Sequence, residues 1–370
     1  RASFEKRGRV NVGVGYAVSI NQVMRFVDQL KTGRIVDHAT LGATVRTTAD
    51  GRVLVDAVDK SSDAFRRGLR YGDQVLAIDG QRVRSANALM NAVATRPAAW
   101  SVRLRFRNPQ GVQQPVVRLE PRHRGGELER VVESELAPSK AGKGGRKSNP
   151  RGAADLYRHR PGYANYAASQ TVTEQLLASC LQRTAVDIGG AWGLSAVDQA
   201  GESIELSLAA DRSEAVTPKG RFWIDSDRPF EEQNGPPGTG GLLVALHAWR
   251  VFVTASGADV DRFTAHGETP WGADGNSARR VVRAFDGATV EYYLESEGNQ
   301  LVAIEAWLRD DADPCRLVFS DLGVGPVALG SDAPGRISVS RGDVTLHEWT
   351  LTRFQAKRDR GAEAGLDESP

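Results

Sequence analysis

The chain has 370 residues, of which 48 are basic, 46 are acidic and 40% are apolar. This length predicts two or three domains, because single hydrophobic cores stop growing at smaller sizes. The net charge of +2 gives no overall attraction to nucleic acid. Apolar runs stay well short of the roughly 18–20 residues that a membrane-spanning helix needs, so we expect no nucleic-acid partner and no membrane span in these residues.

The cysteines and histidines give no pattern that holds a metal. Cys180 and Cys315 lie far apart, which argues against a Cys-x-x-Cys zinc or redox site, and the six histidines are scattered. A disulfide between the two cysteines and two separate thiols both remain open. We expect no metal and no cofactor.

The first 38 residues predict one strand and one helix. Residues 12–18, VGVGYAV, form an apolar strand interrupted by glycines, where another backbone or a ligand passes close. Asn21 can cap a helix that runs to about Thr32, with Val23, Val27 and Leu30 on one apolar face. Because the segment has the character of the end of a domain, we expect the chain to be a fragment of a longer protein.

Residues 39–121 are dense in short strands. TTADGRVLV (47–55) places Asp-Gly between two extended runs, and WSVRLRFRN (100–108) alternates apolar and polar side chains. Ser85 can cap a helix that runs to about Thr95. Together these signals predict a small domain of strands with one clear helix.

Residues 122–160 are rich in Gly, Lys, Arg and Pro and predict a flexible basic linker. A basic patch for acidic surfaces is the alternative, but four glutamates dilute its charge and aromatic residues are scarce.

Residues 161–356 predict an α+β domain. One amphipathic helix over about Tyr163–Thr184 precedes a series of short alternating runs, which indicate a curved antiparallel sheet covered by that helix. RVFVTA (250–255) is among the predicted strands, and GPPGTGG (235–241) is interpreted as a loop that does not open a helix. Residues 357–370 are expected to be a disordered tail.

The loop Thr40–Ala43 is the one stretch with a definable binding role. A loop that exposes successive backbone N–H groups ahead of an open strand edge can hold a peptide's terminal carboxylate while the edge pairs with its backbone. In the helix that follows Ser85, Ala86, Met90 and Val93 share one face and can flank that site.

The order of these elements, with RGLRYGDQVLAIDGQRV (67–83) as its most specific part, resembles a PDZ domain over about residues 39–120. The resemblance implies that Leu41, Gly42 and Ala43 offer N–H groups to a carboxylate and that Thr44 and Val45 continue the peptide-pairing strand. It also implies that Ala86, Met90 and Val93 shape the pocket for the last peptide residue.

The segment that leads into this domain resembles the end of the trypsin-like domain of the HtrA/Deg proteases, in which a final strand and helix run directly into a PDZ domain. The resemblance implies that Gly13, Gly15 and Tyr16 wall a substrate pocket and that the catalytic Ser, His and Asp lie upstream of Arg1. No catalytic residue is therefore assigned in this chain. Without the rest of that barrel, residues 1–37 are expected to be poorly ordered or loosely docked.

The strands of the last domain resemble LolA-type half-barrel domains of bacterial envelope proteins, which implies a curved sheet with a helix on its concave side. The fold expected for the whole chain is thus multidomain α+β: a trypsin-like barrel remnant, a PDZ domain and a curved antiparallel sheet.

Three functions remain open. The first is the C-terminal part of an exported bacterial serine endopeptidase of the periplasm or cell envelope, whose PDZ domain binds C-termini of peptides or unfolded proteins and whose full-length parent can form homo-oligomers. The second is a non-catalytic peptide-binding adaptor, and the third is a carrier of apolar ligands that uses the last domain.

Overall fold

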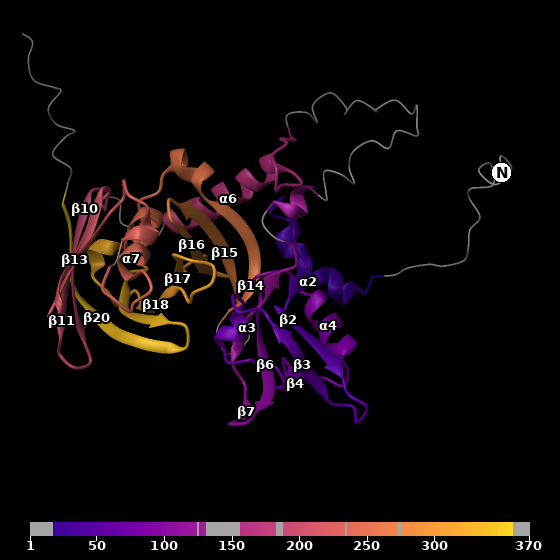
Figure 1. Cartoon of the computed structure of the whole chain (residues 1–370). Coiled ribbons are helices and arrows are strands. Elements are labelled where there is room, and N and C mark those ends of the chain that lie inside the picture. Colours follow the sequence, from indigo (N-terminus) through magenta and orange to yellow (C-terminus); the bar gives the residue numbers. More distant parts are fainter. Residues whose placement is uncertain are drawn as a thin grey trace, which may run out of the picture.

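The computed structural model describes residues 18–123, 126–130, 156–182, 188–233, 235–271 and 276–357. Two β-rich domains lie side by side, an N-terminal domain of residues 39–121 and a C-terminal domain of residues 161–357 (Figure 1). Helix α2 (Ile20–Leu30) precedes the first domain and lies beside it.

The N-terminal domain is built on one seven-stranded antiparallel sheet with the order β2-β3-β4-β6-β7, in which β5 pairs with β4 and β8 pairs with β6. A separate two-stranded pair joins the start of the domain to its end. The strands are β1 (Ala39–Thr40), β2 (Ala43–Thr47), β3 (Val53–Val58), β4 (Gln74–Ile78), β5 (Gln81–Arg82), β6 (Ser101–Asn108), β7 (Gly111–Gln113), β8 (Val116–Arg118) and β9 (Glu120–Pro121).

Local sequence patterns account for this sheet. The Asp-Gly turn joins β2 and β3 as predicted, and β6 buries Val102, Leu104 and Phe106 while the arginines between them are exposed. Two helices complete the domain: α3 (Asp63–Arg66) and α4 (Ala86–Ala94), which begins after Ser85 as predicted.

The C-terminal domain is one curved antiparallel sheet of eleven strands (Figure 1). Its order is β13-β12-β11-β10-β20-β19-β18-β17-β16-β15-β14. Strand β20 pairs with β10, the first strand of the domain, and so joins β10–β13 to the rest of the sheet. The strands are β10 (Ala191–Asp198), β11 (Ser203–Leu208), β12 (Arg212–Thr217), β13 (Gly220–Asp225), β14 (Thr264–Trp271), β15 (Asn276–Phe285), β16 (Ala288–Glu295), β17 (Leu301–Trp307), β18 (Cys315–Leu322), β19 (Pro334–Arg341) and β20 (Val344–Lys357).

The helix at the centre of this core is α7 (Leu242–Val253), which corrects two predictions. Residues 250–255 were expected to be a strand but mostly belong to α7, and the glycine-rich loop 235–241 does open a helix, because Gly241 is its N-cap. Almost every residue of α7 is buried, so its sequence has no polar face to reveal a helical period.

The helix expected to cover the sheet is α6 (Tyr166–Leu181), shorter at both ends than predicted. It contacts β14 and the 3-10 helix η2 (Gly257–Arg262), while α7 covers the sheet interior. Its buried residues are Ser169, Thr173 and Leu177, and Leu176 and Cys180 are partly buried against the core. Cys180 and Cys315 are separate thiols.

Helix α2 is docked more closely than expected. Its Arg25 Nη1 donates to Thr95 Oγ1 at 2.9 Å, and a Cβ on Gly267 of β14 would lie 2.6 Å from the Asp28 carbonyl oxygen. The buried side of α2 carries Phe26 and Gln29. Its predicted apolar face is largely exposed at Val23 and Leu30, so that face does not anchor the helix.

Several predicted segments fall outside the described residues. These are the strand at 12–18 with its proposed pocket residues Gly13, Gly15 and Tyr16, most of the linker at 122–160, and residues 358–370 of the tail. The trypsin-like barrel remnant therefore stays a prediction.

Candidate peptide-binding edge and domain junction

The loop between β1 and β2 is held in one conformation by its neighbours. The Leu41 side chain is 3% exposed in the domain core, and the Gly42 carbonyl accepts a hydrogen bond from the Asp59 N–H at 2.7 Å. Gly42 has a φ of +68°, and a Cβ there would lie 2.5 Å from Ser62 Cβ. Only glycine meets both conditions, so the backbone of this loop is preset.

Strand β2 follows this loop and forms one end of its sheet. Its backbone pairs with β3 on one side, with a register shift between Thr44 and Val45. Its other side is an edge at which a further strand can pair. Ala43 and Val45 are partly buried against the core, so side-chain packing holds the strand in place.

Helix α4 lies beside this edge (Figure 1). The Ala86 N–H donates to Thr47 Oγ1 at 2.9 Å, which ties the start of the helix to the end of β2. Met90 is 48% exposed and Ala86 is half-buried, whereas Val93 is 2% exposed within the core. The predicted face is thus only partly accessible. Ala86 and Met90 reach the surface, whereas Val93 lies beneath them in the core.

A second cluster of polar side chains, which the sequence did not predict, joins the two domains. Arg118 of β8 donates through Nη2 to Glu291 Oε1 at 2.6 Å and through Nη1 to Glu305 Oε2 at 3.4 Å. The Tyr293 hydroxyl lies 2.7 Å from Glu291 Oε2 and 2.9 Å from Glu305 Oε2, so its single proton is shared between two carboxylates. Arg316 Nε completes the cluster by donating to Glu305 Oε1 at 2.7 Å.

The electrostatics of this cluster are dominated by ion pairing. Burial alone would raise the pKa of Glu291, but the guanidinium groups of Arg118 and Arg280 outweigh it and lower that pKa to about 2. Burial, reinforced by Glu291 and Glu305, raises the pKa of the Tyr293 hydroxyl. Glu291 is therefore charged and the tyrosine is neutral at neutral pH.

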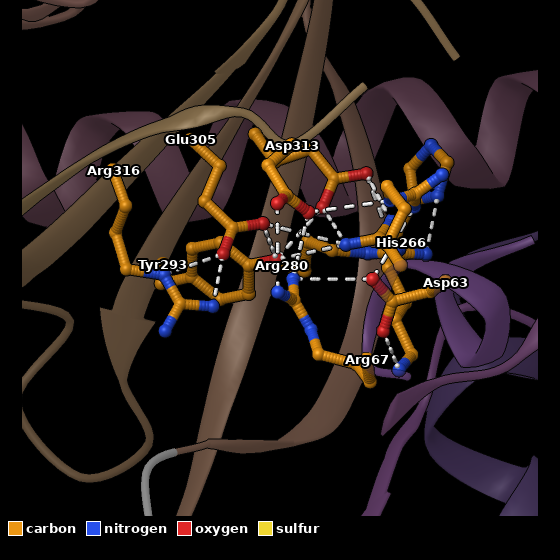
Figure 2. A network of polar contacts seen from close by, with 11 residues as sticks. Asp63, Arg67, His266, Arg280, Tyr293, Glu305, Asp313 and Arg316 are labelled. Atoms are coloured by element: carbon orange, nitrogen blue, oxygen red, sulfur yellow. Dashed lines mark hydrogen bonds and ion pairs between the residues drawn. The ribbon is translucent and has the colours of Figure 1, made fainter. Parts of the chain in front are cut away.

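A further ion-pair group fixes the junction nearby. Arg66 Nε and Arg67 Nη2 of the N-terminal domain lie 3.2 Å and 2.8 Å from Asp313 Oδ1 of the C-terminal domain (Figure 2). Asp63 also pairs with both arginines and accepts from the Arg118 backbone N–H at 2.7 Å. The two clusters thus form one continuous network across the junction.

The sequence gives only a weak indication of this network. Glu291 and Glu305 interrupt the otherwise apolar and aromatic runs TVEYYL and AIEAWL, where a charge is expected only if it is paired. Sequence spacing gives no hint of the partner, because Arg118 and Glu291 are 173 positions apart. The part of the chain that the structure describes holds no group of His, Cys, Asp and Glu residues suited to a metal ion, and it has no helix long and apolar enough to cross a membrane.

The sequence comparisons identify the N-terminal domain. Residues 39–107 match the family of PDZ domains, as predicted. The chain is similar to the serine protease PepD of Mycobacterium tuberculosis, with 31% identity over 108 residues that cover 29% of this chain and 23% of that protein. It is also similar to a probable periplasmic serine endoprotease, DegP-like, of Halomonas elongata, with 34% identity over 90 residues covering 21% of this chain and 19% of that protein.

The chain spans about a quarter or less of the length of these curated relatives. Among solved structures, an HtrA-type protease with a decapeptide aligns with a TM-score of 0.26 and 19% identity, over 32% of this chain and 40% of that chain. A LolA superfamily protein of Nitrosomonas europaea aligns with a TM-score of 0.33 and 5% identity, over 50% of this chain and 94% of that chain. The chain therefore contains a PDZ domain that is similar in sequence to part of the HtrA/DegP-type serine proteases.

Proposed function

We propose that the PDZ domain binds extended peptides with a free, apolar C-terminus along the edge of β2. The observation that carries this proposal is the preset loop at Gly42, which leads directly into a strand edge beside α4. An added peptide strand gains main-chain hydrogen bonds from such an edge, and side-chain pockets next to it supply specificity.

The terminal carboxylate would be held by the backbone N–H groups of Leu41, Gly42 and Ala43. The Gly42 N–H lies 3.3 Å from Thr40 Oγ1, a long hydrogen bond that a charged carboxylate can replace at little cost. Thr44 and Val45 would pair with the peptide backbone. The last peptide side chain would lie between this loop and α4, against Ala86 and Met90 and above Val93.

Within a larger protein, this domain would supply substrate recognition to an exported HtrA/Deg-like serine endopeptidase of the bacterial periplasm or envelope. The similarity to PepD and to proteins named periplasmic endoproteases supports this assignment. A peptide-binding adaptor without protease activity would use the same edge in the same way. Homo-oligomers would depend on parts of the parent protein outside the PDZ domain.

A binding titration tests the proposal. Fluorescence anisotropy of a labelled peptide with a free apolar C-terminus should give a micromolar dissociation constant. This corresponds to a binding free energy of about −7 to −8 kcal/mol. The same peptide with an amidated terminus should bind at least about tenfold more weakly, because it loses the carboxylate contacts. Equal affinity for the two peptides would refute the role of the loop.

A cavity in the C-terminal domain favours one further candidate, the binding of an apolar ligand. The pocket between α7 and the sheet near Trp249 measures only about 60 Å³, too small for an acyl chain. A second cavity of about 440 Å³ has a mixed lining, in which Ile204, Phe222, Leu242 and Trp349 lie beside polar and charged residues that include Glu202 and Lys219. Such a cavity falls in the size range of small-molecule sites.

A fluorescent fatty acid would test this candidate. Phe222→Glu should abolish binding by placing a charge among the apolar residues of the cavity wall, whereas Trp223→Glu should leave it intact, because the neighbouring Trp223 is 49% exposed and does not line the cavity. No saturable binding to the unmodified chain would exclude the carrier function.

A further inference from the structure

A cavity of about 570 Å³ lies where the end of η2 and the strands β14 and β15 meet the segments after α2 and before α6. Its lining contains four arginines, Arg34, Arg160, Arg262 and Arg283, but only one carboxylate, that of Asp261. Arg34, Arg160 and Arg262 come from segments far apart in sequence, so only the fold brings their charges together.

Most of these arginines lack a counter-ion. Within the described residues, no salt bridge joins a carboxylate to Arg34, Arg160 or Arg283. Arg262 has a loose pair, at 3.8 Å, with Asp259. The Asp261 carboxylate accepts hydrogen bonds from Tyr166 and Gln170 rather than from an arginine.

Arg283 is the most unusual member of this group. Its side chain is 8% exposed, and its Nε and Nη1 have no hydrogen-bond partner among the described residues. The guanidinium lies over the rings of Phe263 and Phe285, at 4.9 Å and 4.6 Å from their centroids, which holds it in place without satisfying its donors. Buried unpaired N–H groups on a charged side chain are costly and call for an acceptor.

His266 also lines the cavity. Its Nδ1 lies 2.6 Å from Arg34 Nη1 and 3.1 Å from Arg280 Nη2, and since arginine can only donate, Nδ1 must accept and Nε2 must carry the proton. Burial, followed by the neighbouring arginines, lowers the pKa of His266, so the ring is neutral. Burial, and after it the charge of Arg280, lowers the pKa of Arg34 to about 10.

The adjoining junction cavity, of about 470 Å³, shares Arg34 and His266 but differs in charge. There, Arg118 and Arg280 are neutralised by Glu291, and Glu120 and Glu129 also line the wall. The uncompensated charge is thus confined to the cavity around Arg283.

We propose that the cavity around Arg283 binds a phosphate group, either as inorganic phosphate or as the phosphomonoester of a small molecule. A phosphate dianion offers several acceptor oxygens in a tetrahedral arrangement, which suits guanidinium donors that converge from separate segments. It also carries negative charge, which offsets the excess of four guanidinium groups over one carboxylate in the lining.

Calorimetric titration of the whole chain with inorganic phosphate tests the proposal. Saturable binding is expected, and Arg283→Met should weaken it at least about tenfold while leaving the fold as stable or more stable, because it removes unpaired buried donors. Arg336→Met, an exposed arginine of β19, is the matched control and should bind phosphate normally. If Arg283→Met does not fold, Arg160→Gln at the exposed rim should also weaken binding.

A second titration, with glycerol 3-phosphate, distinguishes the two sources of the phosphate group. Tighter binding than that of inorganic phosphate identifies a phosphomonoester site, and weaker binding identifies a site for the free ion. The proposal is overturned if phosphate shows no saturable binding, if citrate binds as tightly as phosphate, or if Arg336→Met weakens binding as much as Arg283→Met does.

Discussion

Arg118 of the PDZ domain and Glu291 of the C-terminal sheet form a buried ion pair of 2.6 Å across the domain junction. The side chain of Glu291 is 8% exposed, and Glu305 beside it is 2% exposed. Carboxylates this far from water require their arginines. The pair therefore fixes how the two domains meet.

Removal of one partner should destabilise the protein strongly. Arg118→Met leaves Glu291 and Glu305 buried with less compensation, and the expected loss is about 3 kcal/mol or more in the free energy of unfolding, measured in urea. Arg118→Met combined with Glu291→Gln should cost less than the sum of the single changes. Arg309→Met is the control, because its pair with Asp311 is exposed and should contribute nothing measurable. Additive losses would show that the two side chains do not interact.

The loop before β2 should tolerate no side chain at Gly42. Gly42→Ala combines the cost of a positive φ, about 1–3 kcal/mol, with a clash against Ser62, and should also abolish peptide binding. Gly51→Ala is the matched control: its φ is +78° but no atom lies within 4 Å, so only the backbone cost remains. Denaturant unfolding and peptide titration of both variants measure the difference. Equal effects of the two changes would contradict the proposed role of the loop.

Acid should destabilise the C-terminal domain through His247. Burial, followed by the charges of Arg250 and Arg283, lowers its pKa from 6.5 to about 4 in the folded protein. The unfolded chain binds this proton more readily, so stability is fully present above pH 6.5 and falls as the pH drops toward 4, by roughly 3 kcal/mol for this group.

His247→Gln removes this titration and keeps a polar group near Ser213 Oγ, which lies 3.0 Å from the ring Nδ1. The slope of unfolding free energy against pH should therefore become shallower over this range in the variant. An unchanged slope would assign the acid sensitivity to other groups.

The surface of α4 should control the choice of peptide terminus. Met90→Glu introduces a charge next to the proposed pocket and should weaken binding of an apolar C-terminus at least about tenfold. Asn91→Glu adds the same charge at an exposed position on another side of the helix and is the control. Comparable weakening by both variants would point to a general charge effect rather than to contact at Met90.

The sequence predicted the PDZ domain well because its signals are local. The Asp-Gly turn before β3, the alternation in β6 and the cap at Ser85 each depend on a few adjacent residues. The proposed peptide-binding residues lie on those elements, and the burial of Val93 emerged only from the packed structure.

The other features of the structure depend on packing and on long-range contacts that the sequence alone does not show. Helix α7 is mostly apolar and buried on nearly all sides, so its end at RVFVTA was mistaken for a strand. The partners of Glu291 and the donors around Arg283 come from distant segments, and only the folded chain brings them together.

Hydrogen exchange of the whole chain with and without a peptide tests the central claim most directly. A peptide with a free apolar C-terminus should slow exchange in the loop at Leu41–Ala43 and along β2, and the amidated peptide should not. Protection that appears elsewhere while β2 is unchanged, or identical protection by both peptides, would contradict carboxylate recognition at this edge.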